Sequence, residues 1–307
     1  MKRLINVCLL IIVIYATGCS DESKTGTISD NNSFPMLGTL EVYIFDIGKA
    51  DAILIMSKNH TILIDAGENK HGQTIVDYLS DRGISTIDCF IITHFDKDHV
   101  GGADIVIENI NVKEIFVANY AKDSKQYNQF IEASDSMGIK RNVLTEKTEF
   151  IFDEVKFTMY PSSLEYYDYG NSSDDADDNE EADDDSVENE NNYSIALKVT
   201  YGNNNFLFTG DAKAKRLKEL LSLDEITNVQ YDILKVPHHG SYNKRTEDFI
   251  ETINPKYAVI TCSVAEPADT RTIEALEKVG TIIYLTQNGN VHFISDGNNL
   301  TVQVDNN

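Results

Sequence analysis

Residues 93–102 read Thr93-His94-Phe95-Asp96-Lys97-Asp98-His99-Val100-Gly101-Gly102. They follow an apolar run, Cys89 to Thr93, that is typical of a short buried strand. Two His and two Asp within six residues do not suit a hydrophobic core, because an unpaired buried charge is costly. On a tight loop at a strand end they can converge on cations, and they are the ligand types of Zn²⁺, Mn²⁺ or Fe. This stretch therefore predicts a metal site.

Three further apolar runs end in residues of the same kinds. Asp65 follows Ile62 to Ile64, Asp211 follows Phe206 to Gly210, and the pair His238-His239 follows Ile233 to Pro237. One strand that ends in this way would be weak evidence for a site. Four strands that each deliver Asp or His at the C-terminal end predict that these groups share one place in the fold.

The rest of the chain shows two successions of strands followed by helices. Strand-like runs come first at 40–45, 52–56 and 61–64, and helical spacing follows at 73–82. After residue 192 the order repeats, with strands at 195–199 and 205–208 and a helix at 212–221. This alternation predicts two layers of β-sheet between two layers of helix.

The order of the motifs resembles that of the metallo-β-lactamase superfamily. Within it the chain is most similar to the soluble hydrolase domain of the ComEC-like competence proteins, which serve DNA uptake, and to its stand-alone relatives. The stretches that carry the likeness are Phe45 to Ile55, Asn191-Asn192-Tyr193-Ser194 and Lys235 to Ser241. The resemblance spans about residues 39–304. It implies an α/β (α+β) fold, an αββα sandwich of two mixed β-sheets flanked by helices, as the hydrolase domain of residues 39–307.

The resemblance also implies a centre of two divalent metal ions, Zn²⁺ or Mn²⁺. The candidate ligands are His94, Asp96, Asp98, His99, Asp211, His238 and His239. His94 and Asp96 would line the first site. Asp98 and His99 would line the second, together with one of the two adjacent histidines, of which we favour His238.

Two carboxylates would act in catalysis and a third would hold the centre in place. Asp211 would bridge the two ions, and Asp98 and Asp211 are the expected catalytic residues. Asp65 would not bind metal but would orient the ligand loop through hydrogen bonds, because such outer partners fix the direction of a ligand. The sequence assigns no residue to substrate binding.

Several positions depart from the superfamily pattern. Asp96 replaces the middle His of H-x-H-x-D-H, and Asn191 or Asn192 stands in the region of the usual third-motif His. Lys49 and Ala50 stand where the ComEC-like group has Gln and Gly. Oxygen ligands are harder than imidazole and favour Mn²⁺ or Mg²⁺ over Zn²⁺. We therefore expect one of the two sites to bind metal more weakly than the other.

The ligand set predicts hydrolysis without a Ser, Cys or Lys nucleophile. Two cations that share a carboxylate lower the pKa of a bound water, and the hydroxide attacks phosphorus or a carbonyl carbon. The resemblance favours phosphodiesters or nucleic acid outside the cytoplasm as substrate. Two alternatives stay open: a hydrolase of amides, thioesters or lactones, including β-lactams, and a non-catalytic lipoprotein that uses the fold for binding alone.

The N-terminus predicts export and lipid attachment. Met1-Lys2-Arg3 is a short positive region, and Leu4 to Ala16 is an apolar run too short to span a membrane. The stretch from Ala16 to Cys19 resembles a bacterial lipobox. We expect residues 1–18 to be a lipoprotein signal peptide, Cys19 to carry the lipid and residues 19–38 to be a flexible tether. The protein would then be anchored to the outer face of the cytoplasmic membrane or to the outer membrane.

Acidic residues dominate the composition. The formal charge of the chain is −24, and residues 171–192 hold eleven Asp or Glu and no Lys or Arg. Like charges at this density repel, and little apolar area offsets the entropy of ordering, so we expect a disordered insert there. An acidic surface repels polyanions at long range and weighs against tight DNA binding. No protein partner is inferred.

We expect five residues outside the motifs to have structural roles and not to bind metal. Cys89 and Cys262 each lie in an apolar run, so we expect buried strand residues, and their spacing does not argue for a disulfide. His60, His71 and His292 are expected on the surface or on strands, away from the metal centre.

Overall fold

The computed structural model describes residues 38–164 and 189–305. The predicted signal peptide, the lipid-bearing Cys19 and nearly all of the tether lie outside the described residues, as does most of the acidic insert. None of the described helices is long and apolar enough to cross a membrane.

Two mixed β-sheets form the centre of the fold. The eight-stranded sheet has the order β17-β16-β1-β2-β3-β5-β7-β8 and the seven-stranded sheet the order β15-β14-β13-β12-β11-β10-β9. The strands of the first sheet are β1 (Leu40–Ile44), β2 (Ile53–Met56), β3 (Thr61–Ile64), β5 (Cys89–Ile92), β7 (Ile115–Val117), β8 (Arg141–Val143), β16 (Asn290–Ser295) and β17 (Leu300–Asp305). Those of the second are β9 (Thr148–Phe152), β10 (Val155–Tyr160), β11 (Ala196–Tyr201), β12 (Asn204–Phe208), β13 (Ile233–Lys235), β14 (Tyr257–Ile260) and β15 (Ile282–Leu285). A separate short pair joins β4 (Thr86–Ile87) to β6 (Asn111–Val112).

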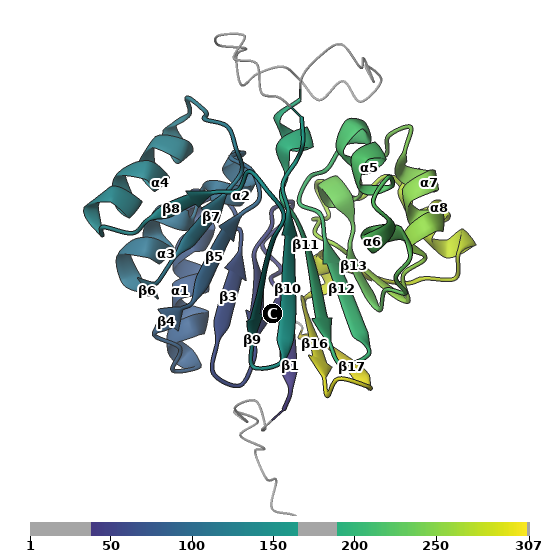
Figure 1. Ribbon diagram of the computed structural model, residues 1–307, viewed down its shortest axis with the longest axis horizontal. Helices are drawn as coiled ribbons and strands as arrows, with labels where there is room; N and C mark the ends of the chain where they lie inside the picture. Colours follow the sequence, from purple (N-terminus) through teal and green to yellow (C-terminus); the bar gives the residue numbers. More distant parts are fainter. Residues whose placement is uncertain (1–37, 165–188, 306–307) are drawn as a thin grey trace, which may run out of the picture. The chain divides into compact units, whose positions relative to one another are not determined.

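Helices cover the outer face of each sheet (Figure 1). The first sheet carries α1 (Gly72–Asp81), α2 (Lys97–Val100), α3 (Ala103–Asn109) and α4 (Lys125–Ser136). The second carries α5 (Ala214–Leu220), α6 (Asp224–Thr227), α7 (Thr246–Ile253) and α8 (Thr270–Lys278). Short 3-10 turns are η1 (Asn69–His71), η2 (Glu190–Tyr193), η3 (Pro237–Gly240) and η4 (Thr286–Asn288). The αββα sandwich expected from the sequence is confirmed.

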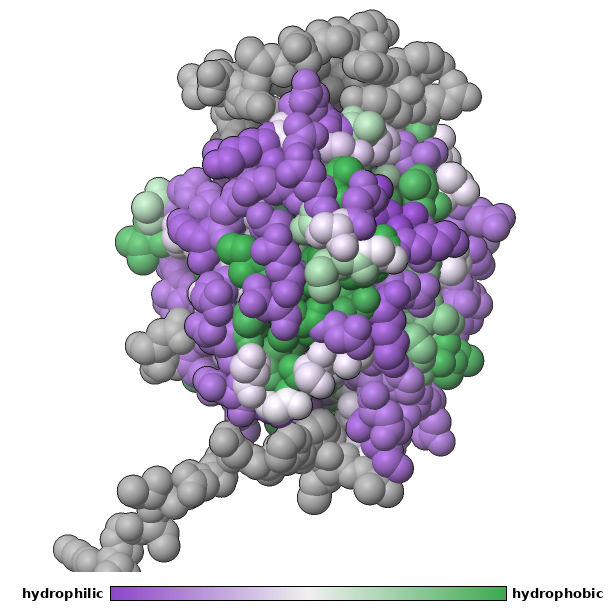
Figure 2. All heavy atoms as spheres, turned by 90° about the vertical axis from the view of Figure 1, so that its left-hand side faces the viewer, coloured by the Kyte–Doolittle hydropathy of each residue, from purple (hydrophilic) through white to green (hydrophobic). Residues whose placement is uncertain are grey.

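The alternation of side chains along a strand builds separate cores on its two faces. On β1, Val42 and Ile44 are buried against the facing sheet, whereas Tyr43 packs with the buried residues of α1, among them Ile75 and Leu79. A strand covered on both faces is apolar at consecutive positions, which explains the continuous apolar runs in the sequence. The outer surface on the side of α1, α3 and α4 is mainly hydrophilic, as Figure 2 shows.

Parallel pairing brings the ends of the site-bearing strands to one edge of the sandwich. β3 runs parallel to β5, with Ile64 opposite Ile91. β12, β13 and β14 are also parallel, with Phe208 opposite Lys235 and Lys235 opposite Val259. The residues that follow these strands therefore emerge together, and α/β folds bind their ligands at such carboxyl ends.

The predicted extent of the acidic insert is wrong at its C-terminal end. Asn191 and Asn192 belong to η2 and are buried. The side chain of Asn189 accepts a hydrogen bond from the backbone of Asn191, and Asn192 accepts one from the backbone N–H of Arg216. Charge repulsion, which motivated the prediction, does not apply here because Glu190 is the one acidic residue among residues 189–192.

A buried guanidinium fixes the chain after η2. Arg216 has no solvent exposure, and its Nε donates to the carbonyl of Ser194 at 3.0 Å. Its Nη2 donates to the carbonyl of Tyr160 at 2.6 Å, and its Nη1 pairs with Glu219 at 2.6 Å. A buried cation is tolerated only when its donors are matched in this way. Arg216 thus joins β10, η2 and α5.

We predict that Arg216→Ala lowers the free energy of unfolding by about 3–5 kcal/mol, because it strands one carboxylate and two carbonyls inside the protein. Lys218→Ala is the matched control, since Lys218 is an exposed cation on the same helix. It should change stability by no more than about 0.5 kcal/mol. Urea unfolding measures both variants. Equal effects would show that Arg216 contributes only surface charge.

Candidate metal centre

Unusual backbone conformations point the candidate ligands into one space. Asp65 directly follows β3 with φ 55°, and Asp211 follows Gly210, whose φ is 53°. His238 and His239 have φ values of 48° and 53° in the turn after β13. Non-glycine residues rarely adopt positive φ, and strain of this kind concentrates at functional sites.

Four side chains form a compact group. Asp98, His99, Asp211 and His239 each offer a ligand atom, and these atoms all lie within 4.8 Å of one another. The Oδ2 atom of Asp211 is 3.2 Å from Nε2 of His99 and 3.2 Å from Nε2 of His239. The Oδ2 atom of Asp98 is 3.3 Å from Nε2 of His239. Two imidazoles and two carboxylates are a suitable ligand set for a divalent cation.

The preference for His238 in this group is corrected by the geometry. His239 is buried in the group, whereas Nε2 of His238 is 3.9 Å from Asp211 and 3.3 Å from the amide nitrogen of Asn191. The two imidazoles diverge because both residues are left-handed in a turn that begins at Pro237. Sequence spacing alone does not specify this direction.

A second group lies beside the first. The His94 and His99 rings are 4.0 Å apart between centroids, and Nε2 of His94 is 3.6 Å from Oδ2 of Asp96. His238 and Asn191 complete it, and Asn191 rather than Asn192 is the asparagine that reaches this site. All seven residues expected as ligands are therefore brought together in the two groups.

Buried polar atoms without a hydrogen-bond partner indicate whether these groups suit a cation. Within the described part of the chain, Nε2 of His94 and Oδ1 of Asp211 are buried and have no hydrogen-bond partner; the charged groups beside them, Asp96 and Lys235, are each 3.6 Å away. Buried polar atoms are nearly always paired, so such exceptions need an explanation. Imidazole nitrogen and carboxylate oxygen are metal donors. The residues present therefore fit divalent cations held near both atoms.

Asp65 contacts two residues of the first motif, Thr93 and His99. Its carboxylate accepts hydrogen bonds from the backbone N–H and the hydroxyl of Thr93, at 2.8 and 2.7 Å. It also contacts Nδ1 of His99 at 2.8 Å. That contact holds the proton of His99 on Nδ1 and leaves Nε2 turned toward Asp211, which is the usual role of a carboxylate behind a metal-binding His.

An ion pair behind the centre was not predicted. The ammonium of Lys235 contacts the Asp51 carboxylate, and both side chains are buried. Asp51 also accepts a hydrogen bond from the hydroxyl of Thr261 at 2.7 Å and lies 3.5 Å from Nδ1 of His239. Both charged residues stand in the quoted motifs, and Lys235, a charged residue inside the otherwise apolar strand β13, was the available signal.

Lys122 is a third residue that the sequence did not single out, after Lys235 and Asp51. Its ammonium is 2.8 Å from Oδ1 of Asp96 and 2.7 Å from Oε2 of Glu190. Lys122 lies between β7 and α4, far in sequence from both partners. The ammonium of Lys122 neutralises part of the negative charge of Asp96. We therefore expect this carboxylate to bind a cation more weakly than an unpaired carboxylate would.

The metal-free imidazoles are basic. Burial by itself would lower the pKa of His239, but the carboxylates of Asp211 and Asp51 outweigh burial and raise it to about 9. Burial is likewise outweighed at His99, where Asp211 and Asp65 hold the pKa well above its usual value. A positive charge is thus favoured where a cation would bind.

The pKa values of Asp98 and His238, which lie beside these imidazoles, are lowered. Burial would raise the pKa of Asp98, but its hydrogen bond to His239 and the charge of His99 lower it to about 2. Burial lowers the pKa of His238 to about 3, an effect to which the ammonium of Lys213 adds. At neutral pH Asp98 is therefore ionised and His238 is neutral, and both states are competent for metal binding.

The three remaining histidines lie outside the centre, as expected. His60 contacts Asp153 at 2.9 Å, and His292 contacts Glu41 at 2.8 Å. His71 accepts a hydrogen bond from the backbone at η1. Cys89 and Cys262 are buried and free.

We predict that Asp98→Ala and His99→Ala abolish metal binding in the compact group with little loss of fold. Affinity should fall by more than the roughly 10- to 100-fold typical of outer partners. His239→Ala should act in the same way, and His238→Ala should affect only the second group. Metal titration of purified variants checks this. Unchanged metal content in Asp98→Ala would refute the assignment.

We predict a characteristic pH dependence. A cation must displace the protons of both His239 and His99, so metal affinity should rise by at least about tenfold per pH unit until the pH passes the His239 pKa of about 9. Stability of the chelator-treated protein should change in the opposite sense. A folded pKa above the unfolded value of about 6.5 stabilises below that pH, and this contribution is lost as pH rises toward 9. Calorimetric titration and thermal melts between pH 6.5 and 9 test both, and pH-independent affinity would contradict the reasoning.

Comparison with known families agrees with this geometry. The family model described as the metallo-beta-lactamase superfamily matches residues 46–263. The chain belongs to this superfamily. The match covers every candidate ligand, and the superfamily supports metal-dependent hydrolysis as the broad class of activity.

Curated relatives of this superfamily member include ComEC-like competence proteins. ComE operon protein 3 of Bacillus subtilis is 24% identical over 280 residues, which is 83% of this chain and 33% of that protein. Competence protein ComA of Neisseria gonorrhoeae is 26% identical over 228 residues, 73% of this chain and 27% of that protein. The chain thus spans about a third or less of the length of these relatives. The expected ComEC-like similarity is confirmed.

Solved structures confirm the fold. A metallo hydrolase from the archaeon Ignicoccus hospitalis superposes with a TM-score of 0.51 at 15% identity, covering 83% of this chain and 98% of the other. The metallo-beta-lactamase fold protein YhfI of Bacillus subtilis gives 0.50 at 11% identity, covering 81% and 96%.

Proposed function

We propose that this protein hydrolyses phosphodiesters, with nucleic acid first among them. The observation that carries the proposal is the compact group of Asp98, His99, Asp211 and His239 beside the unpartnered Nε2 of His94. Similarity to competence proteins, and to Recombination protein 2 of Haemophilus influenzae, favours nucleic acid over β-lactams.

The residues of the centre can orient substrate and the attacking water. Divalent cations, when bound, supply Lewis acidity to water and to the phosphoryl oxygens. Asp98 is ionised at neutral pH and partly exposed, so its carboxylate can orient the attacking water by accepting a hydrogen bond from it. Asp211 is buried between the two groups and fixes their separation. Asp65 and Asp51 restrain the imidazoles from behind, which limits reorganisation during the reaction.

We further propose that the centre holds two cations of unequal affinity. The compact group offers four charged or imidazole donors. The second group replaces an imidazole by Asp96, which already pairs with Lys122, and contains the amide of Asn191. Oxygen donors shift preference from Zn²⁺ toward Mn²⁺. One site should therefore fill before the other.

We predict that Mn²⁺ supports faster turnover than Zn²⁺ and that two binding steps are resolved. The protein is stripped with chelator, and each metal is titrated back while stoichiometry and rate are followed. Lys122→Met should tighten the weaker step by freeing Asp96, and Lys125→Met is the control on the neighbouring helix. Two equally tight Zn²⁺ with maximal activity in Zn²⁺ alone would refute this assignment.

The substrate class is tested by a panel. Bis-p-nitrophenyl phosphate, single-stranded DNA, double-stranded DNA and nitrocefin are incubated with the metal-loaded wild type and with Asp98→Ala. The proposal requires turnover of at least one phosphodiester that is lost in the variant. Turnover of nitrocefin alone would establish the amide or lactone alternative. A protein that binds metal but turns over no member of the panel would support the binding lipoprotein.

Export and lipid attachment at Cys19 are also proposed. In a bacterial host, incorporation of radiolabelled palmitate and membrane fractionation test them. Cys19→Ser should lose the label and leave the membrane fraction. A wild-type protein that takes up no label would refute acylation.

A further inference from the structure

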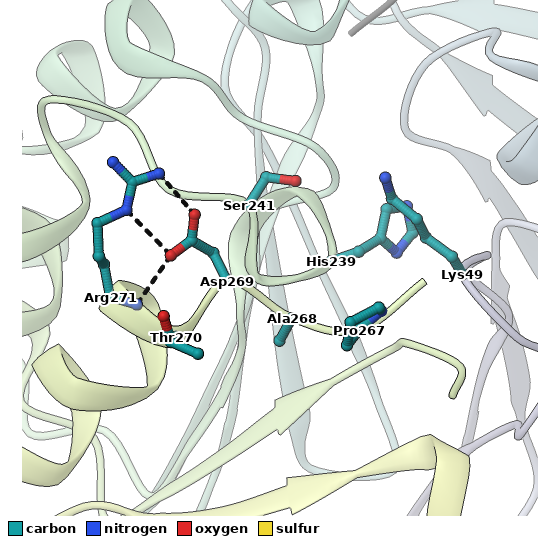
Figure 3. Close-up of a pocket in the computed structure, with 8 residues that line it drawn as sticks. All are labelled: Lys49, His239, Ser241, Pro267, Ala268, Asp269, Thr270 and Arg271. Carbon is teal, nitrogen blue, oxygen red and sulfur yellow. Dashed lines mark hydrogen bonds and ion pairs between the residues drawn. The ribbon is translucent and has the colours of Figure 1, made fainter. Parts of the chain in front are cut away.

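A cavity opens beside the metal centre. Its volume is about 410 Å³, and it shares His239 with the compact group (Figure 3). The other lining residues are Lys49, Ser241, Pro267, Ala268, Asp269, Thr270 and Arg271. The volume suits a small-molecule group rather than a single ion. A substrate bound at the centre can therefore extend into this space.

The charges that line the cavity do not cancel. Arg271 and Asp269 form a bidentate pair, with Nη2 to Oδ2 at 2.6 Å and Nε to Oδ1 at 3.1 Å, drawn as dashed lines in Figure 3. Lys49 has neither an ion pair nor a hydrogen bond within residues 38–164 and 189–305. Its ammonium is therefore a positive charge of the cavity wall that no carboxylate of these residues neutralises, in addition to the imidazole of His239. Ser241 and Thr270 add hydroxyl donors.

The backbone ties Lys49 to the centre. Lys49 lies between β1 and β2, two residues before Asp51, which contacts His239. The backbone N–H of Asp51 also donates to the carbonyl of Asp98 at 3.1 Å. The loop that carries Lys49 is therefore fixed against the ligand loop, so the ammonium is within reach of the cavity that Lys49 lines.

We propose that this cavity binds a phosphate group of the substrate adjacent to the phosphodiester that is cleaved, with Lys49 as the residue that selects it. This inference rests on the proposed function. A chain with a formal charge of −24 repels polyanions at long range, so a local cation is needed to hold one. A charge-assisted contact to a phosphate oxygen is about twice as strong as a neutral one, and an unpaired ammonium is available for it.

The test separates a phosphate in the cavity from a phosphate at the metals. Thymidine 3′,5′-bisphosphate can fill both places, whereas thymidine 5′-monophosphate fills one. Their dissociation constants are measured by calorimetry on the full, Mn²⁺-loaded protein. Lys49→Ala should weaken the bisphosphate by about tenfold and the monophosphate by less than about twofold. Lys49→Arg should retain most of the affinity, because it keeps the charge.

Lys58→Ala is the matched control. Lys58 is an exposed lysine in the turn between β2 and β3, at the opposite end of β3 from Asp65, and its loss removes the same charge. It should leave both affinities unchanged. Unchanged bisphosphate affinity in Lys49→Ala, or equal losses in Lys49→Ala and Lys58→Ala, would overturn the proposal.

Hydrolysis of bis-p-nitrophenyl phosphate, measured alongside, separates the two claims. If the wild type hydrolyses it and Lys49→Ala binds bisphosphate normally, the phosphate subsite is wrong and the proposed function stands. If bisphosphate binds through Lys49 without any hydrolysis of phosphodiesters, the subsite stands and the proposed function is wrong.

Discussion

A network of buried charges holds the centre together. It runs from Asp65 through His99 to Asp211, and from there through Lys235 to Asp51. None of these charged side chains would be stable in the protein interior without partners, because the free energy lost with its hydration exceeds the stabilisation that one neighbouring charge provides. Each is stabilised by partners that other strands supply. The position of every ligand therefore depends on the packing of the two sheets. Bound cations would offset the free-energy cost of burying several carboxylates close together.

The two sheets divide the centre between them. β3 and β5 of the first sheet are followed by Asp65 and by the His94–His99 loop, and β12 and β13 of the second are followed by Asp211 and His239. The compact group takes Asp98 and His99 from the loop of the first sheet, and Asp211 and His239 from the loops of the second. Because both sheets deliver carboxyl ends of parallel strands to one edge, short loops suffice to bring the donors within reach.

The sequence predicted the parts of this arrangement that are local. An apolar strand followed by Asp or His is visible in one dimension, so Asp65 and Asp211 could be placed without coordinates. The direction of His239 could not, since it depends on two successive left-handed residues after Pro237. Lys122 could not be placed either, because it reaches Asp96 from a loop whose path is set by the packing of α4. The fold was predicted more completely than the contacts behind the ligands. The layers of sheet and helix can be inferred from the periodicity of apolar residues, whereas these contacts depend on the paths of loops.

The strand order also interlocks the two halves of the chain. The hairpin β9–β10 comes from the first half but completes the second sheet, and β16–β17 comes from the second half but pairs with β1. A backbone cut between residues 164 and 189 would leave two fragments, each with an unpaired strand edge that matches the other. Open edges seek partners. In such a nicked molecule the pairs β1–β16 and β10–β11 would still join the two fragments, so the covalent connection through this segment is not what holds the two halves together.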